Sequence, residues 1–344
     1  MINLHLFIPS LFWHEPTLPE IYHELPTPSL GALLAKSTKT KEPPQEIEPW
    51  LCNTFNVTKQ QNWPVAPIML YAEDNCKIDT RADYWLRADP VHLRIEQNHI
   101  LLADSQAFNI SIKESKQLAD TLNQHLAKDG IEFLLLNHDR WYIRLSQTPN
   151  IKTFALSQIT GKNINDFLPS GEDSLFWHNI FNETQMLLYE HPVNQARLAR
   201  NELTINSIWL WGGGIMPESV KSSYHKIWCN DLLSRALALA SATQHAKLPP
   251  NAEIWQQSAA PGNHFVVLDT LWKKIQYNDA YGWREEFKKL EQNWFSPLYA
   301  AVQEGEINKL TLTTLNENFT RSFTITRKDL WKFWSTTKPL STYT

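Results

Sequence analysis

Residues 205–214 read INSIWLWGGG, a short apolar run that ends in three glycines. A run of this length, rich in β-branched and aromatic residues, predicts a buried strand. Glycines at the carboxyl end of a strand allow positive φ and let a ligand approach the backbone. Gly212, Gly213 and Gly214 are therefore candidate ligand-binding residues, and a tight structural turn is the alternative.

The sequence HPVN at 191–194, followed by Arg197, lies just upstream of this strand. We predict a helix over 174–190 that stops here, because proline cannot continue a helix. His191, Asn194 and Arg197 would bring an imidazole, an amide and a guanidinium together, a set that suits an anionic ligand. A helix end with a hydrogen-bonded cap explains the same residues without a ligand.

The segment before the predicted 174–190 helix has the order of strands and helices of a small α+β module. Two extended runs, YWLRADPVHLR (84–94) and HILLAD (99–104), precede a helix that opens with the capping box SIKE (111–114) and closes at Gly130. IEFLLL (131–136) and RWYIRL (140–145) then predict a hairpin. Arg140, Tyr142 and Arg144 share one of its faces. With Arg87 and Arg94 they would form a small basic surface for a phosphorylated ligand or RNA, or simply the solvated side of a sheet.

Strands and helices alternate at both ends of the chain. The predicted elements are a strand at 3–12, a helix at 30–36, a charged linker at 39–48, a helix at 223–243, strands at 264–269, 309–315 and 322–327, and a helix at 278–304. This order predicts an α/β fold with a core split between 1–80 and 200–344 and an inserted α+β domain at 81–199.

Metal-binding patterns are weak. His225 and Cys229 are four residues apart on the predicted 223–243 helix, and two ligands do not make a site. His14 and His23 each precede a glutamate in a proline-rich loop. The chain contains neither a GxSxG elbow nor a CxxC pair.

Composition narrows the class of protein. The 344 residues are 42% hydrophobic and 20% charged, which is typical of a folded protein of about two domains. The net charge of −4 leaves no global basic field for binding nucleic acid or an anionic membrane, so we do not expect a nucleic-acid partner. No apolar run approaches the roughly 18 residues of a membrane span. Three separated cysteines and an N-terminus without secretory features lead us to expect a cytoplasmic protein without a membrane partner.

Four ordered motifs give a family resemblance. Gly161-Lys162, LPSG (168–171), HPVN with Arg197, and WLWGGG (209–214) resemble a segment of the archaeal-type cofactor-independent phosphoglycerate mutases. The likeness covers roughly 80–245, and the full-length pattern is most similar to the bacterial RpfE-type regulatory proteins. The resemblance implies an alkaline-phosphatase-like α/β core that carries an insertion.

The resemblance also implies chemistry that this chain departs from. Those mutases use two divalent metals and a transiently phosphorylated serine. Where the first metal ligand is expected, IPSLFW (8–13) has no carboxylate, and 38–52 has no serine. Later metal positions fall on VVLDTLWKKIQYND (266–279), which keeps only Asp269 and Asp279, and on LNENFTRSF (315–323), which has neither aspartate nor histidine.

From these observations we expect a degenerate, non-catalytic phosphoglycerate-mutase-like pseudoenzyme with a regulatory or ligand-sensing role and no cofactor. Its partner would be a phosphorylated small molecule or a protein. One alternative is a metal-dependent mutase or phosphatase whose Mn or Zn ligands are relocated to His225, Asp231, Asp269 and Asp279, with His14 and His23 as further candidates. The other is a protein-interaction module that docks a partner on exposed tryptophans.

Overall fold

The computed structural model describes residues 1–13, 19–74, 77–96, 99–160 and 162–343. The chain forms two compact units, residues 1–55 with 221–344, and residues 56–220. The boundaries expected from the sequence, at 80/81 and 199/200, fall inside the second unit. The division into 1–80 with 200–344 and 81–199 stays a prediction about independently folding domains.

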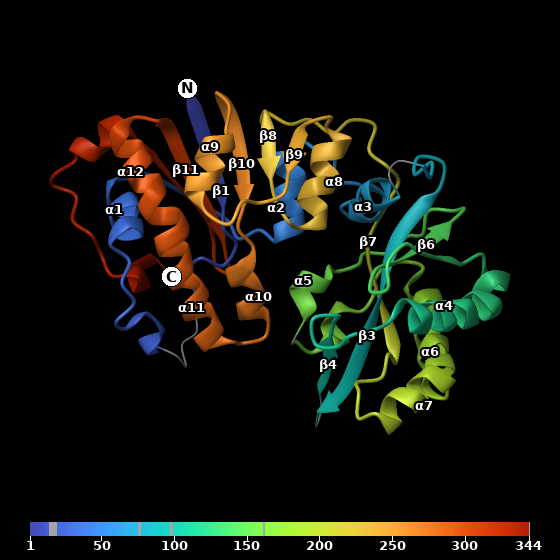
Figure 1. Cartoon of the computed structure of the whole chain (residues 1–344). Coiled ribbons are helices and arrows are strands. Elements are labelled where there is room, and N and C mark those ends of the chain that lie inside the picture. The colour runs from blue at the N-terminus through green and yellow to red at the C-terminus, as the bar shows by residue number, and fades with distance from the viewer. Residues whose placement is uncertain (14–18, 75–76, 97–98, 161, 344) are drawn as a thin grey trace. The chain divides into compact units, whose positions relative to one another are not determined.

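The first unit is built on a seven-stranded sheet with the order β2-β12-β11-β1-β10-β8-β9 (Figure 1). Its strands are β1 (Ile2–Phe7), β2 (Thr38–Glu42), β8 (Lys226–Trp228), β9 (Gln244–Ala246), β10 (Gly262–Val267), β11 (Ile307–Leu315) and β12 (Thr320–Thr326). The strands from β11 to β9 run parallel, and β12 and β2 are antiparallel additions at one edge.

Helices cover both faces of this sheet. They are α1 (Pro28–Lys36), α2 (Ile47–Thr54), α8 (Leu232–Ala240), α9 (Ala252–Ser258), α10 (Thr270–Gln276), α11 (Ala280–Leu290) and α12 (Ser296–Glu304). Side chains alternate along a strand, so Leu4 and Leu6 of β1 pack in the core shared with α1, α11 and α12. Phe7 points to the other face, where its ring stacks 4.1 Å from that of Trp50 in α2.

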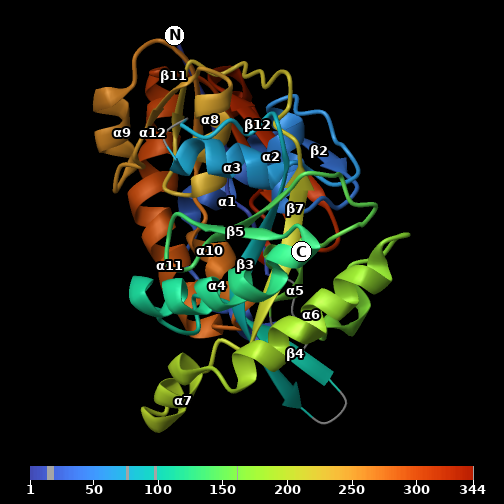
Figure 2. The ribbon, with the colours of Figure 1, turned by 90° about the vertical axis from the view of Figure 1, so that its right-hand side faces the viewer.

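The second unit is an antiparallel sheet in which β3 is the central strand (Figure 2). The strands are β3 (Tyr84–Glu96), β4 (His99–Ala103), β5 (Glu132–Leu135), β6 (Trp141–Leu145) and β7 (Ser207–Gly214), and the helices are α3 (Val65–Glu73), α4 (Ile112–Leu126), α5 (Leu156–Ile159), α6 (Ser174–Tyr189) and α7 (Pro192–Ala199). Leu118 and Leu122 of α4 and Ile180 of α6 share a core with the sheet, whereas α3 packs on β3 and β7.

Two predicted segments are wrong. Residues 223–243 do not form one helix: β8 pairs in parallel with β10, and Asp231 then accepts a hydrogen bond from the Ser234 N–H as the N-cap of α8. Residues 39–48 are not only a linker, because β2 pairs with β12 along the sheet edge. Both strands are stabilised by distant partners rather than by local sequence.

The remaining predicted elements are found close to their expected positions. The capping box of α4 is present, with the Ser111 hydroxyl accepting from the Glu114 N–H, and Gly130 has φ +73 where the helix ends. The predicted 278–304 helix consists of α11 and α12 joined by a π-helical turn at 291–295. No helix in the described part of the chain is long and apolar enough to cross a bilayer.

Candidate functional site

The three glycines lie within β7 rather than in a turn after it. A Cβ on Gly213 would collide with the Tyr84 hydroxyl and lie 2.7 Å from the Leu86 Cδ2, and one on Gly214 would lie 2.5 Å from the Pro64 Cβ. Gly212 has φ +66, a conformation that favours glycine. These glycines therefore allow close packing of β7 against β3 and the start of α3. Their ligand-binding role stays a prediction.

His191 and Asn194 hold the chain together around α7. The His191 Nδ1 accepts from the Val193 N–H as the helix cap, and its Nε2 lies 3.1 Å from the Thr121 hydroxyl. The Asn194 amide donates to the Leu188 and Ile205 carbonyls and accepts from the Ile205 N–H at 2.7–2.8 Å. Because Ile205 precedes β7 and the glycines end it, the two predicted groups lie at opposite ends of the strand.

Arg197 is buried, with 1% of its surface exposed, and it borders a groove of about 700 Å³ between the start of α4 and α7. Its guanidinium donates to the Leu203 and Asn109 carbonyls and to the Glu114 carboxylate. The same carboxylate accepts from Arg200 at 2.9 Å. The two guanidiniums that border this groove are thus already paired with a carboxylate of the chain.

The alternative metal ligands are not brought together as a set, although two of them, Asp231 and Asp269, are neighbours. His225 precedes β8 and its Nδ1 accepts from the Asn263 N–H, whereas Asp231 and Asp269 follow the carboxyl ends of β8 and β10. Asp279 accepts from Lys274 at 2.9 Å and caps α11. His23 is exposed on a different loop, and His14 lies outside the described residues.

The residues present do not fit a pair of divalent metals. Asp231 and Asp269 are neighbours: burial raises the pKa of Asp231, and the charge of Asp269 adds to that shift. The Asp231 Oδ2 is buried without a hydrogen-bond partner among the described residues, but Asp269 accepts from Lys273 at 2.6 Å. Among those residues no three His, Cys, Asp or Glu side chains gather as a metal cluster.

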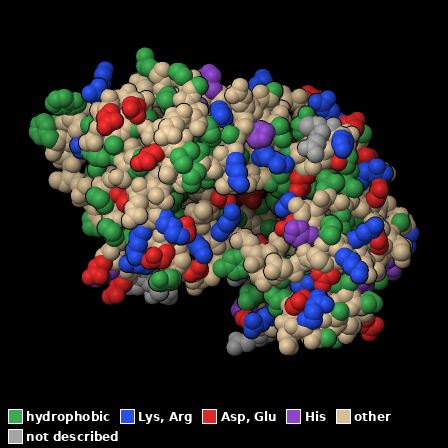
Figure 3. Space-filling view, viewed as in Figure 1, with side chains coloured by type: hydrophobic (Ala, Val, Ile, Leu, Met, Phe, Trp, Pro, Cys, Tyr) green, Lys and Arg blue, Asp and Glu red, His purple; other side chains and the backbone are tan. Residues whose placement is uncertain are grey.

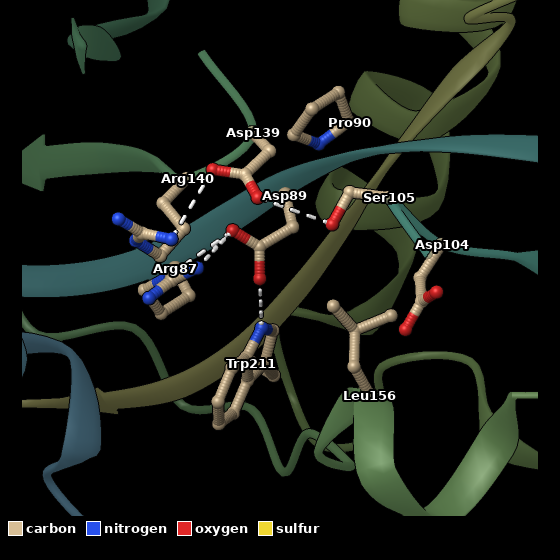
Figure 4. Close-up of a pocket in the computed structure, with 9 residues that line it drawn as sticks. All are labelled: Arg87, Asp89, Pro90, Asp104, Ser105, Asp139, Arg140, Leu156 and Trp211. Atoms are coloured by element: carbon tan, nitrogen blue, oxygen red, sulfur yellow. Dashed lines mark hydrogen bonds and ion pairs between the residues drawn. The ribbon is translucent and has the colours of Figure 1, made fainter. Parts of the chain in front are cut away.

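The second unit contains a polar cavity of about 180 Å³ between β3, β7 and the turns after β4 and β5 (Figure 4). Its lining residues are Arg87, Asp89, Pro90, Asp104, Ser105, Asp139, Arg140, Leu156 and Trp211. Strand geometry explains the first pair, because Arg87 and Asp89 are two residues apart on β3 and point to the same face. The other members come from distant segments of the second unit.

A buried ion pair forms the floor of this cavity. The Arg87 guanidinium donates twice to one oxygen of Asp89, and both side chains are at most 4% exposed. The other Asp89 oxygen accepts from the Trp211 indole N–H at 2.7 Å (Figure 4). Arg87 also lies 5.0 Å from the Tyr142 ring and 5.4 Å from the Trp211 ring. Burial raises the pKa of Asp89, an effect that Arg87 and Trp211 oppose.

The rim is more accessible to solvent. Arg140 has 30% of its side chain exposed and donates to Glu73 at 2.6 Å and to Asp139 at 3.2 Å. The other Asp139 oxygen accepts from the Ser105 hydroxyl at 3.2 Å. The phenol of Tyr142 donates to the second Glu73 oxygen, and the Arg87 guanidinium lies over the Tyr142 ring, so the rim network contacts the floor through this ring.

The predicted basic surface is wrong. Arg87 pairs with Asp89, Arg94 with Glu96, and Arg140 with Glu73 and Asp139. Arg144 pairs with Glu132 and lies 3.9 Å from Asp83. Two guanidiniums and three carboxylates line the cavity, so its chemistry is mixed rather than basic. It offers acceptors for hydroxyl groups and, at Arg140, a donor for an anionic group.

The two-residue spacing of Arg87 and Asp89 in an extended segment puts both on one face, but nothing in the sequence identified Asp104, Ser105, Asp139 or Trp211 as parts of a site. The available signal was weak: Asp104 and Ser105 follow a predicted strand, and Asp139 lies in a hairpin turn, positions where polar residues are common. Only the pairing of β3 with β4, β6 and β7 shows that these segments meet.

Comparisons with known proteins identify relatives of one part of the chain. Residues 80–194 match the family model described as 2,3-bisphosphoglycerate-independent phosphoglycerate mutase. A Methanosarcina mazei protein of that name is 33% identical over 138 residues, or 39% of this chain and 35% of the relative. A Geobacter sulfurreducens protein described as a probable mutase of the same kind is 26% identical over 146 residues, covering 42% and 36% of the two chains.

The chain thus spans about a third of the length of these curated relatives. The solved structure of the PH0037 protein from Pyrococcus horikoshii is similar over most of both chains, with a TM-score of 0.59, 10% identity, and coverage of 94% of this chain and 87% of that one. The expected fold class, an alkaline-phosphatase-like α/β fold, is confirmed. Similarity to the phosphoglycerate mutases lies chiefly in the second unit, which contains the polar cavity.

Proposed function

We propose that this protein is a non-catalytic relative of the cofactor-independent phosphoglycerate mutases that senses a small ligand in the cavity of its second unit. The observation that carries the proposal is the cavity itself: charged and polar side chains line it, and all of its lining residues except Trp211 lie in the segment that matches those mutases. A regulatory role of the RpfE type, in the cytoplasm, is the finer form of this proposal.

The cavity suggests a ligand with two kinds of group. The carboxylates of Asp104 and Asp139 would accept hydrogen bonds from hydroxyls, and the partly exposed Arg140 would donate to a carboxylate or phosphate. Inorganic phosphate supplies the anionic group but has no alcohol hydroxyl for the carboxylates to bind. A phosphorylated hydroxy acid such as 3-phosphoglycerate meets both requirements and is the first probe.

The absence of catalysis is proposed from the first unit. At the carboxyl edge of its parallel sheet, Asp269 is paired with Lys273 and Asp279 with Lys274. Asp231 is engaged as a helix cap through one of its oxygens. These carboxylates would have to give up their present partners before they could bind a metal ion. The metal-dependent mutase or phosphatase remains the rival function, favoured by the unpartnered Asp231 Oδ2.

A thermal-shift titration with 3-phosphoglycerate tests the sensing role. The melting temperature should rise with 3-phosphoglycerate and less with inorganic phosphate or glycerol, because a ligand that binds only the folded state stabilises it. Arg140→Gln should lower the apparent affinity for 3-phosphoglycerate, obtained from the concentration dependence of the shift, by about tenfold, the usual effect of losing one charge-assisted hydrogen bond. Arg144→Gln is the matched control, since Arg144 is also salt-bridged on this hairpin but does not line the cavity.

The same protein, supplied with Mn²⁺ or Zn²⁺, should neither interconvert phosphoglycerates nor hydrolyse a phosphomonoester. Turnover that is lost in Asp231→Asn would establish the rival enzyme. If 3-phosphoglycerate raised the melting temperatures of the two arginine variants equally, or did not raise that of the unmodified protein, the cavity would not be the site of ligand sensing.

A further inference from the structure

The C-terminal part of the first unit exposes three bulky aromatic side chains close together. Trp331, Phe333 and Trp334 are 79%, 87% and 68% exposed, and the last two rings lie 5.0 Å apart. Single exposed apolar residues are common, but a contiguous aromatic patch usually marks an interaction site. We refer to these three residues as the aromatic patch.

Basic residues are frequent in the segment that carries the aromatic patch and in the segment 36–42 next to it, and we refer to the basic residues of 36–42 and 321–338 as the cationic border. Lys332 donates to the Lys36 carbonyl at 3.1 Å, and Lys36 donates to the Leu330 carbonyl at 2.9 Å, which ties this segment to the end of α1. Thr337 packs beside Gly31 of α1, in agreement with Figure 1, where the red C-terminal segment runs next to that helix. Lys338 is near Lys39 of β2, and this proximity contributes to a lowered pKa of Lys39, whose first cause is burial.

The charge of this region opposes that of the whole chain. Segments 36–42 and 321–338 together contain eight Lys or Arg residues and two Asp or Glu residues, in a protein whose net charge is −4. The acidic residues are Glu42, which is exposed at the end of β2, and Asp329, which pairs with Lys332 at 2.7 Å. Over most of the face in Figure 3, basic and acidic side chains are interspersed.

We propose that the aromatic patch and its cationic border bind the surface of an anionic phospholipid bilayer. Tryptophan is favoured at the membrane interface, where its ring is partly buried and its N–H remains hydrated. Lysine and arginine beside it would interact with anionic headgroups while their stems cover apolar surface. The expectation of no membrane partner rested on the net charge of the whole chain and on the absence of a spanning segment, whereas this proposal rests on a local basic region, and the protein would lie on the bilayer.

The geometry favours a bilayer over single-stranded nucleic acid. Nucleic-acid sites stack successive bases on aromatic faces along a basic groove. The Phe333 and Trp334 rings meet at 80°, edge to face, and present no common plane for neighbouring bases. A bilayer interface needs no such alignment, because its apolar layer accepts rings in any orientation.

Co-sedimentation with vesicles tests the proposal on the full chain. The protein should bind phosphatidylcholine vesicles that contain phosphatidylglycerol, bind pure phosphatidylcholine at least tenfold more weakly, and dissociate when salt screens the charges. Replacing Trp331, Phe333 and Trp334 together by alanine should weaken binding by roughly tenfold or more. These side chains are exposed, so the fold should tolerate the change, and an unchanged circular dichroism melt verifies this.

Two further variants separate the contributions. Lys328→Gln with Lys338→Gln should weaken binding by about fivefold per removed charge. Tyr281→Ala, which removes an aromatic side chain that is 77% exposed elsewhere in the same unit, should leave binding unchanged. Equal binding to both vesicle types, no binding to either, or tighter binding to a single-stranded oligonucleotide through the aromatic patch would overturn the proposal.

Discussion

At the scale of single residues, His5 shows how burial sets chemistry. Its ring lies on β1 with Nδ1 2.6 Å from the Tyr224 hydroxyl and Nε2 2.8 Å from the Thr313 hydroxyl. Burial lowers the pKa of His5 to about 4, and the nearby Lys309 adds to the shift. His5 is therefore neutral at pH 7, and it links β1 to β11 and to the segment before β8.

The lowered pKa of His5 predicts a loss of stability in acid. Between pH 6.5 and 4 the histidine of the unfolded chain gains a proton while the folded one does not, so the free energy of unfolding falls by up to about 3 kcal/mol. His5→Gln should remove this part of the pH dependence. Urea unfolding of both proteins at pH 7 and pH 4.5 measures it, and an identical decrease in both would contradict the assignment.

At the scale of elements, the structure shows which parts the sequence could predict. The α4 capping box and the β3–β4 and β5–β6 pairs have local signals, and each is present. The strands β8 and β2 escaped prediction because their pairing partners are far away in the chain. In the cavity, the two-residue spacing of Arg87 and Asp89 was readable, but Asp104 and Asp139 come from separate turns that only tertiary pairing brings together.

The packing of β7 predicts a sharp response at Gly213. Gly213→Ala should destabilise the protein by about 2 kcal/mol or more, because the new methyl group would collide with Tyr84 and Leu86. Gly31→Ala is the control. Gly31 lies within α1, where alanine is favoured over glycine, and the new methyl group would make an ordinary 3.6 Å contact with Thr337. Denaturant midpoints of the two variants should move in opposite directions, and a neutral Gly213→Ala would refute the close approach.

Asn194 joins the end of α6, α7 and the chain entering β7. Asn194→Leu should lower the free energy of unfolding by about 2–4 kcal/mol, because three buried backbone groups lose their hydrogen-bond partner. Gln195→Leu, at an exposed neighbouring position, serves as control. Chemical denaturation compares the two, and a loss below 1 kcal/mol for Asn194→Leu would show that water replaces the amide.

At the scale of the whole molecule, the second unit has the features of an autonomous fold. Residues 56–220 are one continuous stretch, and their core is formed by β3, β5, β6, β7, α4 and α6. The expected insertion at 81–199 omits both β7 and α3. β7 pairs with β3 over most of its length, so a domain that ends at 199 would leave one edge of the central strand β3 without its hydrogen-bonding partner.

Separate expression of the two segments tests this. Residues 56–220 should give a cooperative urea transition by tryptophan fluorescence, whereas 81–199 should not, because β3 would lose β7 and the helix that packs on both strands. Cooperative unfolding of 81–199 would restore the narrower domain boundaries.

The position of β1 in its sheet also has a consequence for biosynthesis. β1 is paired on one side with β10 and on the other with β11, so residues near position 2 have neighbours at 262 and 307. During translation these neighbours emerge after residues 56–220, which leave the ribosome as a continuous block. The N-terminal strand must therefore wait, with its apolar side chains exposed, until the C-terminal strands arrive. The strand β1 is therefore synthesised well before the strands that enclose it.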